Sequence, residues 1–170
     1  MKKENQKATY KNLKVLEFYK KLPFNFYSDS QIAIKNIKDL NLIENYPFLK
    51  KIIENKNSTV VELGCGVGWF TNNLSYNFPK IKVIGVDFNP KSIEFANKVK
   101  QELNLNSQFI QEDLFTFNYN NDINLIVSLG VLHHTNNCLE GIKKIISLKP
   151  RFFMLGLYHK YGRKPFLDHF

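Results

Sequence analysis

The segment VVELGCGVGWF, residues 60–70, places a glycine-rich turn between a β-branched strand and a helix. Gly64, Gly66 and Gly68 alternate with other residues in this turn, and Glu62 stands on the strand itself. Glycine accepts left-handed backbone angles and lets the backbone approach a ligand closely. Ligands of open parallel sheets bind at the carboxyl ends of the strands, where this turn lies. The segment therefore predicts an α/β fold with a ligand-binding site at the turn.

Strands and helices alternate from Ser58 onward. Short β-rich runs predict strands at 59–63, 82–87, 107–110, 123–128 and 152–157. Apolar residues at helical spacing lie between them, in helices that begin near Trp69, at Asn89 and near Cys138. In the last helix the inward face is expected to hold Leu139, Ile142, Ile145 and Ile146. The alternation predicts a Rossmann-like, doubly wound and mostly parallel sheet with helices on both faces.

The first 57 residues form a different, helical region. Apolar spacing predicts a helix over 7–22 that Pro23 ends, and a second helix capped by Ser28, Asp29 or Ser30. Pro47 is suited to begin a third helix, with Phe48, Leu49, Ile52 and Ile53 facing inward. A polar linker then places a domain boundary near Asn57, between an N-terminal helical region, 1–57, and a main domain, 58–170.

Length and composition exclude several classes of protein. The chain has 170 residues, of which 44% are hydrophobic, so it is neither a disordered tail nor a pair of globular domains. It lacks an apolar run of the ~20 residues that a membrane helix needs, and no apolar segment of a signal peptide follows the basic N-terminus. We expect a cytoplasmic protein in which Cys65 and Cys138 are reduced thiols. No metal-ligand spacing is present, so no metal site is predicted.

The net charge of +9 is concentrated at the N-terminus, where residues 1–57 hold 12 lysines and 6 acidic residues. A basic region of this kind attracts nucleic acid or an anionic substrate through its long-range field. Lysine is also abundant in the rest of the chain, and most lysines fall on solvated helix faces. Charge alone therefore does not decide between these readings.

The glycine spacing separates two kinds of ligand. A dinucleotide-binding turn has the pattern G-x-G-x-x-G, and its third glycine falls where this chain has Trp69. The order here is acid-x-G-x-G-x-G, which resembles motif I of the class I S-adenosylmethionine-dependent methyltransferases. A nucleotide-linked dehydrogenase is accordingly the weaker reading.

The resemblance continues downstream, over about residues 58–158. GVDFNP places Asp87 at a strand end, IQEDLF places Asp113 after the third strand, and DINLIVSLGVLHHT resembles motif IV of the UbiE-like branch. The resemblance implies S-adenosylmethionine as cofactor, with Asp87 on the ribose hydroxyls, Phe88 over the adenine, and Asp113 and Leu114 at the adenine edge. The remaining cofactor-binding residues that the resemblance implies are Glu62, Gly64, Cys65, Gly66, Gly68 and Ser128.

His133 and His134 follow the fourth strand, where the family's methyl-acceptor pocket lies. A histidine there can take a proton from the acceptor, or it can be a polar residue that only shapes the pocket. The expected acceptor is a small molecule held under the N-terminal helices, near Phe24, Phe26 and Tyr27. An RNA acceptor and a non-catalytic binding remnant are the alternatives.

The chain departs from the family pattern in two places. The family's K-P-G-G turn reads Lys149-Pro150-Arg151-Phe152, without the glycines. The last two of the family's seven strands have no counterpart before residue 170, so the chain is expected to be short at its C-terminus and to leave a sheet edge uncovered. The oligomeric state is left open.

Overall fold

The computed structural model describes residues 13–21, 29–53 and 57–158. At its centre is a sheet of five parallel strands in the order β3-β2-β1-β4-β5. The strands are β1 (Thr59–Leu63), β2 (Lys82–Asp87), β3 (Gln108–Gln111), β4 (Leu125–Leu129) and β5 (Phe152–Gly156). The strand order reverses between β1 and β4, which makes the sheet doubly wound. The predicted fold class is confirmed.

The strand bounds follow from local pairing. β1 and β2 have the predicted bounds, and β1 is buried along its whole length because the sheet is covered on both faces. β4 begins later than predicted, at Leu125, because the side-chain oxygen of Asn124 accepts the Thr59 N–H at 2.8 Å. The ladder between β1 and β4 therefore starts after Asn124.

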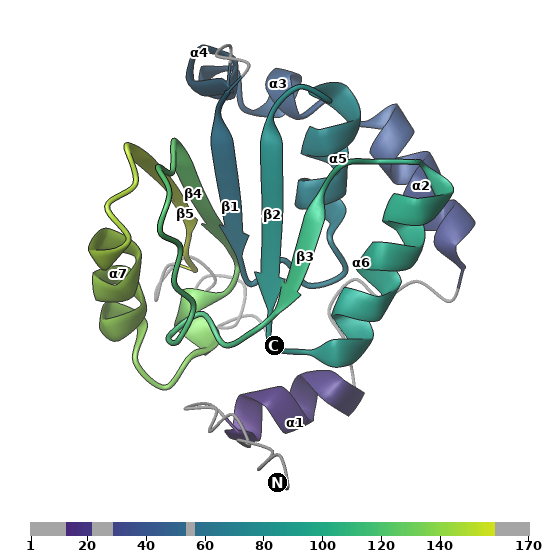
Figure 1. Cartoon of the computed structure of the whole chain (residues 1–170). Coiled ribbons are helices and arrows are strands. Elements are labelled where there is room, and N and C mark those ends of the chain that lie inside the picture. The colour runs from purple at the N-terminus through teal and green to yellow at the C-terminus, as the bar shows by residue number, and fades with distance from the viewer. Residues whose placement is uncertain (1–12, 22–28, 54–56, 159–170) are drawn as a thin grey trace, which may run out of the picture.

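Helices cover both faces of the sheet, and Figure 1 shows α2, α5 and α6 on one side and α7 on the other. Their bounds are α1 (Leu13–Lys21), α2 (Ser30–Asp39), α3 (Leu42–Asn45), α4 (Phe48–Ile53), α5 (Trp69–Asn77), α6 (Pro90–Glu102) and α7 (Cys138–Ser147). A single 3-10 turn, η1 (Leu132–His134), follows β4. Neither α3 nor η1 was predicted, because such short elements carry too few residues to show a period.

The N-terminal helices α2 to α4 share the core of the main fold. Val60, Val83 and Leu125 of the sheet pack against Phe70 and Leu74 of α5. The same cluster contains the buried side chains of α3 and α4, namely Leu42, Leu49 and Ile53. These helices therefore help to fix the position of α5, and with it the glycine turn that precedes α5.

Three apolar residues that were expected to face inward are exposed instead. Phe48 is 47% exposed, Leu139 is 60% exposed and Ile146 is 56% exposed. In α7 the buried line passes through Gly141 and Ile145, so Leu139 and Ile146 fall at its side. The predictions were wrong because an apolar stripe on a helix is wider than the strip that contacts the sheet.

α1 lies apart from the other N-terminal helices. Figure 1 shows it beyond the carboxyl ends of the strands. It was predicted as part of a helix over 7–22, of which 7–12 and Leu22 lie outside the described residues. The Asn89 Nδ2 donates to the backbone carbonyl of Tyr19 at 2.8 Å, which ties α1 to the end of β2. One N-terminal helix is thus placed where ligands of this fold bind.

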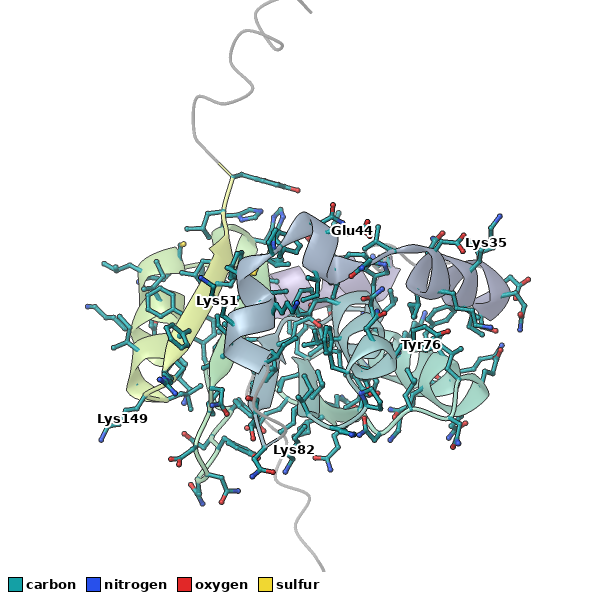
Figure 2. All side chains as sticks on the ribbon, turned by 90° about the horizontal axis from the view of Figure 1, so that it is seen from above. Lys35, Glu44, Lys51, Tyr76, Lys82 and Lys149 are labelled. Atoms are coloured by element: carbon teal, nitrogen blue, oxygen red, sulfur yellow. The ribbon has the colours of Figure 1, made fainter. Side chains whose placement is uncertain are left out.

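The amino ends of the strands and the outer edge of β5 differ from the carboxyl ends in the side chains and coverage that they present. Figure 2, seen from the amino ends of the strands, shows Lys51, Lys82 and Lys149 around this end. On β5, Phe152 and Phe153 are exposed, and no described strand pairs with its outer edge. Within the described part of the chain, no helix is long and apolar enough to cross a membrane.

Candidate functional site

The glycine turn joins the end of β1 to the start of α5. The φ angles of Gly64, Gly66 and Gly68 are +80°, +52° and +77°, in the left-handed region that favours glycine. The backbone N–H groups of Gly64 and Cys65 donate to the carbonyl of Val86, at 2.8 and 3.0 Å. The turn is therefore held against the end of β2.

Two of these glycines are needed for different reasons. A Cβ on Gly64 would overlap the side chain of Val131, which packs against the turn from the segment after β4. A Cβ on Gly66 would meet nothing within 4 Å. Gly64 therefore serves packing, whereas Gly66 leaves open space at the site.

Replacing each glycine by alanine should separate these roles. Both variants carry the backbone cost of a left-handed alanine, and Gly64→Ala adds the overlap with Val131. We expect Gly64→Ala to lower the free energy of unfolding by about 2 kcal/mol more than Gly66→Ala does. Urea denaturation of both variants measures the difference; equal losses would show that Val131 moves aside freely.

Asp87, the last residue of β2, organises the turn and the start of α6. Its Oδ2 accepts from the Gly66 N–H and its Oδ1 from the Asn89 N–H, both at 2.8 Å. The Asn89 Oδ1 in turn accepts from the Lys91 N–H and caps α6. Asp87 is only 9% exposed, and burial raises the pKa of its carboxyl, against which the two backbone hydrogen bonds act. Asn89, not Asp87, is the helix cap.

Glu62 braces α5 against β1. Its Oε2 accepts from the backbone N–H and the hydroxyl of Thr71, at 3.1 and 2.5 Å. Burial raises the pKa of the Glu62 carboxyl to about 8, because the two hydrogen bonds from Thr71 only partly offset desolvation. Glu62 also lines the cavity at the carboxyl ends of the strands, so its charge state bears on any ligand there.

A cavity of about 280 Å³ opens at the carboxyl ends of the strands. Four carboxyl side chains line it, and its described lining contains no lysine or arginine. These carboxyls are Glu62, Asp87, Glu112 and Asp113. In a chain of net charge +9, such a lining suits a cationic ligand with hydroxyl groups and opposes a pyrophosphate.

Asp113 and its neighbours form the far wall of this cavity. Asp113 is buried, and its Oδ1 accepts from the Phe115 N–H at 3.0 Å, in a turn that follows β3. The Glu112 N–H donates to the carbonyl of Asp87 at 3.0 Å, which holds this turn beside the end of β2. Leu114 also lines the cavity.

Most of the residues expected at the site line the cavity, and three do not. Those that line it are Glu62, Gly64, Cys65, Gly66, Asp87, Phe88, Asp113, Leu114 and His134. Gly68 is the N-cap residue before α5, where a Cβ would overlap Ala96 and the ring of Phe109. The Ser128 hydroxyl is buried and donates to the carbonyl of Leu63 at 2.9 Å. His133 does not line the cavity, and its ring centroid lies 4.1 Å from that of His134.

Cys65 has the environment of a packed thiol. It is buried, and a Cβ on Gly85 of β2 would meet its Sγ. The pKa of the thiol is raised well above its usual value. Burial is the largest cause, and the charges of Asp87 and Glu62 raise the pKa further. A thiol in this state is a poor nucleophile.

The two histidines differ in their surroundings. His134 is exposed and lines the cavity, and its ring makes an edge contact with Tyr19 at 6.1 Å. Both ring nitrogens of His133 are shielded from solvent and have no hydrogen-bond partner among the described residues. Burial and the neighbouring His134 lower the pKa of His133, which keeps its ring neutral. Of the two, only His134 can reach a ligand in the cavity.

Several lining residues were missed in the sequence. Examples are Tyr19, Asn89, Ser92, Glu112, Val131, Thr135 and Tyr158. Glu112 and Asn89 each adjoin a residue of the family motifs just after a strand end. That position in the sequence could have identified them. Tyr19 was marked only as part of the predicted helix over 7–22, and Tyr158 carried no signal. The described residues hold no group of three or more His, Cys, Asp or Glu side chains placed to bind a metal ion.

The chain is similar over part of its length to curated proteins that are named as methyltransferases. The chain is 34% identical over 67 residues to a putative protein N5-glutamine methyltransferase of Methanocaldococcus jannaschii, covering 39% of this chain and 34% of that protein. It is 35% identical over 94 residues to a malonyl-[acyl-carrier protein] O-methyltransferase of Ilyobacter polytropus, covering 55% of this chain and 34% of that protein. The chain thus spans about a third of the length of these curated relatives.

A solved structure shares the fold. The magnesium protoporphyrin IX methyltransferase of Synechocystis PCC 6803, crystallised with bound SAM, superposes with a TM-score of 0.63 at 18% identity, covering 88% of this chain and 76% of that one. The family model described as a methyltransferase domain matches residues 54–155, from just before β1 almost to the end of β5. The match spans more than half of the sequence, and the chain belongs to the methyltransferase-domain family.

Proposed function

We propose that this chain binds S-adenosylmethionine in the cavity and transfers its methyl group to a small-molecule acceptor. The observation that carries the proposal is the four-carboxyl lining around the glycine turn, without a described lysine or arginine. The cofactor carries a sulfonium and an ammonium group, and both are stabilised by nearby carboxylates.

The proposal gives the cofactor-facing residues separate tasks. Asp87 uses one lone pair of each oxygen on the protein, and the others are available to the ribose hydroxyls. Gly66 leaves room for the cofactor to approach the turn. Phe88 and Leu114, which line the cavity, supply apolar surface for the adenine.

The acceptor side is formed by α1 and the segment after β4. Tyr19, Val131, His134 and Thr135 line the cavity there. The volume of about 280 Å³ lies just below the usual range for one drug-sized ligand, so a cofactor bound there leaves room for only a small acceptor group. Phe24, Phe26 and Tyr27, expected near the acceptor, lie outside the described residues.

Methyl transfer needs an oriented acceptor more than a strong base. The acceptor atom attacks the methyl carbon, the carbon–sulfur bond breaks, and its electron pair stays on sulfur. Because the sulfonium is a good leaving group, alignment of the two reactants supplies much of the rate. In this proposal His134, which lines the cavity, takes the proton that a hydroxyl or amine acceptor releases.

RNA is the less well supported acceptor. The carboxyl-rich lining repels backbone phosphates, and the lysines that Figure 2 labels around the amino ends of the strands lie away from the cavity. The two curated relatives are named for different acceptors, a protein glutamine and a carrier-bound malonyl group, so the family does not choose the acceptor.

Binding and label transfer test the proposal. Calorimetry should show micromolar binding of S-adenosylmethionine, and at least tenfold weaker binding of NAD. The chain is then incubated with methyl-labelled cofactor and a cell extract divided into small-molecule, RNA and protein fractions. We expect label in the small-molecule fraction, about tenfold less with His134→Gln, and unchanged cofactor affinity in that variant.

Other outcomes separate the alternatives. Label in the RNA fraction would support an RNA acceptor. A folded chain that binds no cofactor would refute the proposal, and cofactor binding without transfer to any fraction would favour a non-catalytic binding protein.

A further inference from the structure

The side chain of Asn89 caps two helices that come from different parts of the chain. Its Oδ1 accepts from the Lys91 N–H and so caps the start of α6. Its Nδ2 donates to the carbonyl of Tyr19, in the last turn of α1, at 2.8 Å. Asn89 is only 1% exposed, so both hydrogen bonds are shielded from water. A single buried amide therefore joins the end of α1 to the start of α6.

The Tyr19 carbonyl needs a hydrogen-bond donor from outside its own helix. In a continuous α-helix this carbonyl would accept from the N–H four residues further on, at position 23. That residue is Pro23, which has no backbone N–H. The sequence thus leaves the Tyr19 carbonyl without a helical partner, and Asn89 supplies the donor.

The helix α1 depends on docking for its stability. Its nine residues are fewer than the ~12–15 that an isolated helix needs to be even marginally stable in water. Leu16 is buried, whereas Glu17 and Phe18 on the same helix are exposed. With so few buried side chains described on α1, the hydrogen bond from Asn89 is a large part of what holds the helix in place.

Docked α1 forms part of the cavity. Tyr19 lines the cavity together with Asp87, and its ring centroid lies 6.1 Å from that of His134. Figure 1 shows α1 beyond the carboxyl ends of the strands, where the cavity opens. A ligand in the cavity can contact Tyr19 there only while α1 is docked, so it binds the docked state more tightly. Occupancy of the cavity must then shift α1 toward the docked state.

We infer that Asn89 is a positioning residue for the proposed methyl transfer, on which this inference rests. Through its Nδ2 it docks α1 over the cavity and so places Tyr19 at the acceptor side. The Asn89 backbone N–H also donates to Asp87 Oδ1 at 2.8 Å. The acid assigned to the cofactor and the helix at the acceptor side are thus joined through one residue. Cofactor binding and the docking of α1 are coupled, and each strengthens the other.

Hydrogen–deuterium exchange of α1 tests the inference. Asn89→Ser keeps a side-chain oxygen that can cap α6 but lacks the Nδ2 donor. Without ligand, the amides of residues 17–21 should exchange about fivefold faster in this variant than in the parent, whereas the amides of α7 should be unchanged. A saturating concentration of S-adenosylhomocysteine should slow the exchange of α1 in the parent by at least about fivefold. Loss of the α6 cap alone would not change the exchange of α1.

Asn137→Ser is the matched control. The Asn137 Oδ1 caps α7 by accepting from the Glu140 N–H, and its exposed side chain does not line the cavity. In this variant α1 should exchange as in the parent. Asn89→Asp, which keeps the cap and the shape but has no donor, is the second variant and should exchange α1 as Asn89→Ser does.

Three outcomes would count against the inference. Folded Asn89→Ser and Asn89→Asp proteins whose α1 exchanges as in the parent would overturn it. Calorimetry measures the affinity of the parent for S-adenosylhomocysteine, and binding that leaves the exchange of α1 unchanged would overturn the inference alone. A folded parent that binds no S-adenosylhomocysteine would refute the proposed function, and the inference with it.

Discussion

Replacing Asp87 by asparagine should weaken binding of S-adenosylhomocysteine by at least about 100-fold. Each carboxylate oxygen of Asp87 accepts one backbone N–H, from Gly66 or from Asn89. An asparagine amide presents a donor to one of these N–H groups, so either the glycine turn or the start of α6 loses its partner. The ribose hydroxyls lose a charged acceptor at the same time. Two charge-assisted hydrogen bonds at about 1.5–3 kcal/mol each account for a loss of this size.

The measurement is calorimetric titration of the parent and the variant with S-adenosylhomocysteine. Asp122→Asn is the matched control, since Asp122 is exposed and precedes β4 at the amino end of the sheet. The control should bind like the parent. If Asp87→Asn stays folded and binds within threefold of the parent, Asp87 holds only the turn and the cofactor site must be reassigned.

The turn and the acid at the end of β2 could be predicted because their signals are local. Gly64, Gly66 and Gly68 follow directly on a β-branched run, and the backbone has left-handed angles at all three. Asp87 ends a strand whose bounds the sequence shows, and parallel strands bring their carboxyl ends to one edge. Short-range pattern and topology together were therefore sufficient for this half of the site.

Ser128 was expected at the cofactor site, but it does not line the cavity. The expected fourth strand ended at this residue, which would have placed its hydroxyl at the rim of the site. β4 continues to Leu129, so Ser128 stays inside the ladder and bonds to Leu63. Leu129 and Gly130 form the rim instead. A shift of one residue in a strand end decided whether a side chain reached the cavity.

Apart from His134, the acceptor side could not be predicted, because it depends on long-range packing. Tyr19 and Tyr158 stand far from the glycine turn in the sequence. Tyr19 belongs to the apolar face of the predicted helix over 7–22, which says nothing about the cavity, and Tyr158 belongs to no pattern with a period or a cap. They meet His134 only because α1 is tied to Asn89 and β5 lies beside β4. Contacts of this kind arise from the tertiary arrangement, which no single segment encodes.

Glu62→Gln should make the free energy of unfolding less dependent on pH. The folded carboxyl has a pKa of about 8 against 4.5 for the ordinary group, because burial opposes its charge. The folded state therefore keeps a proton that the unfolded state releases above 4.5. The associated stability is complete below 4.5 and falls as the pH rises to about 8, where the slope ends. The difference is about 3.5 pKa units, so at about 1.4 kcal/mol per unit we expect the parent to lose about 5 kcal/mol relative to Glu62→Gln over this range.

Urea denaturation of both proteins across this pH range measures the difference, and Glu94→Gln, an exposed substitution on α6, should follow the parent. A constant difference between the parent and Glu62→Gln would show that Glu62 is ionised in the folded state.

The proton on the Glu62 carboxyl also bears on cofactor binding. A sulfonium or ammonium group beside Glu62 favours the carboxylate, so binding should release a proton near neutral pH. Calorimetry in buffers of different ionisation enthalpy detects that release, and it should be absent in Glu62→Gln, because the amide has no proton to lose.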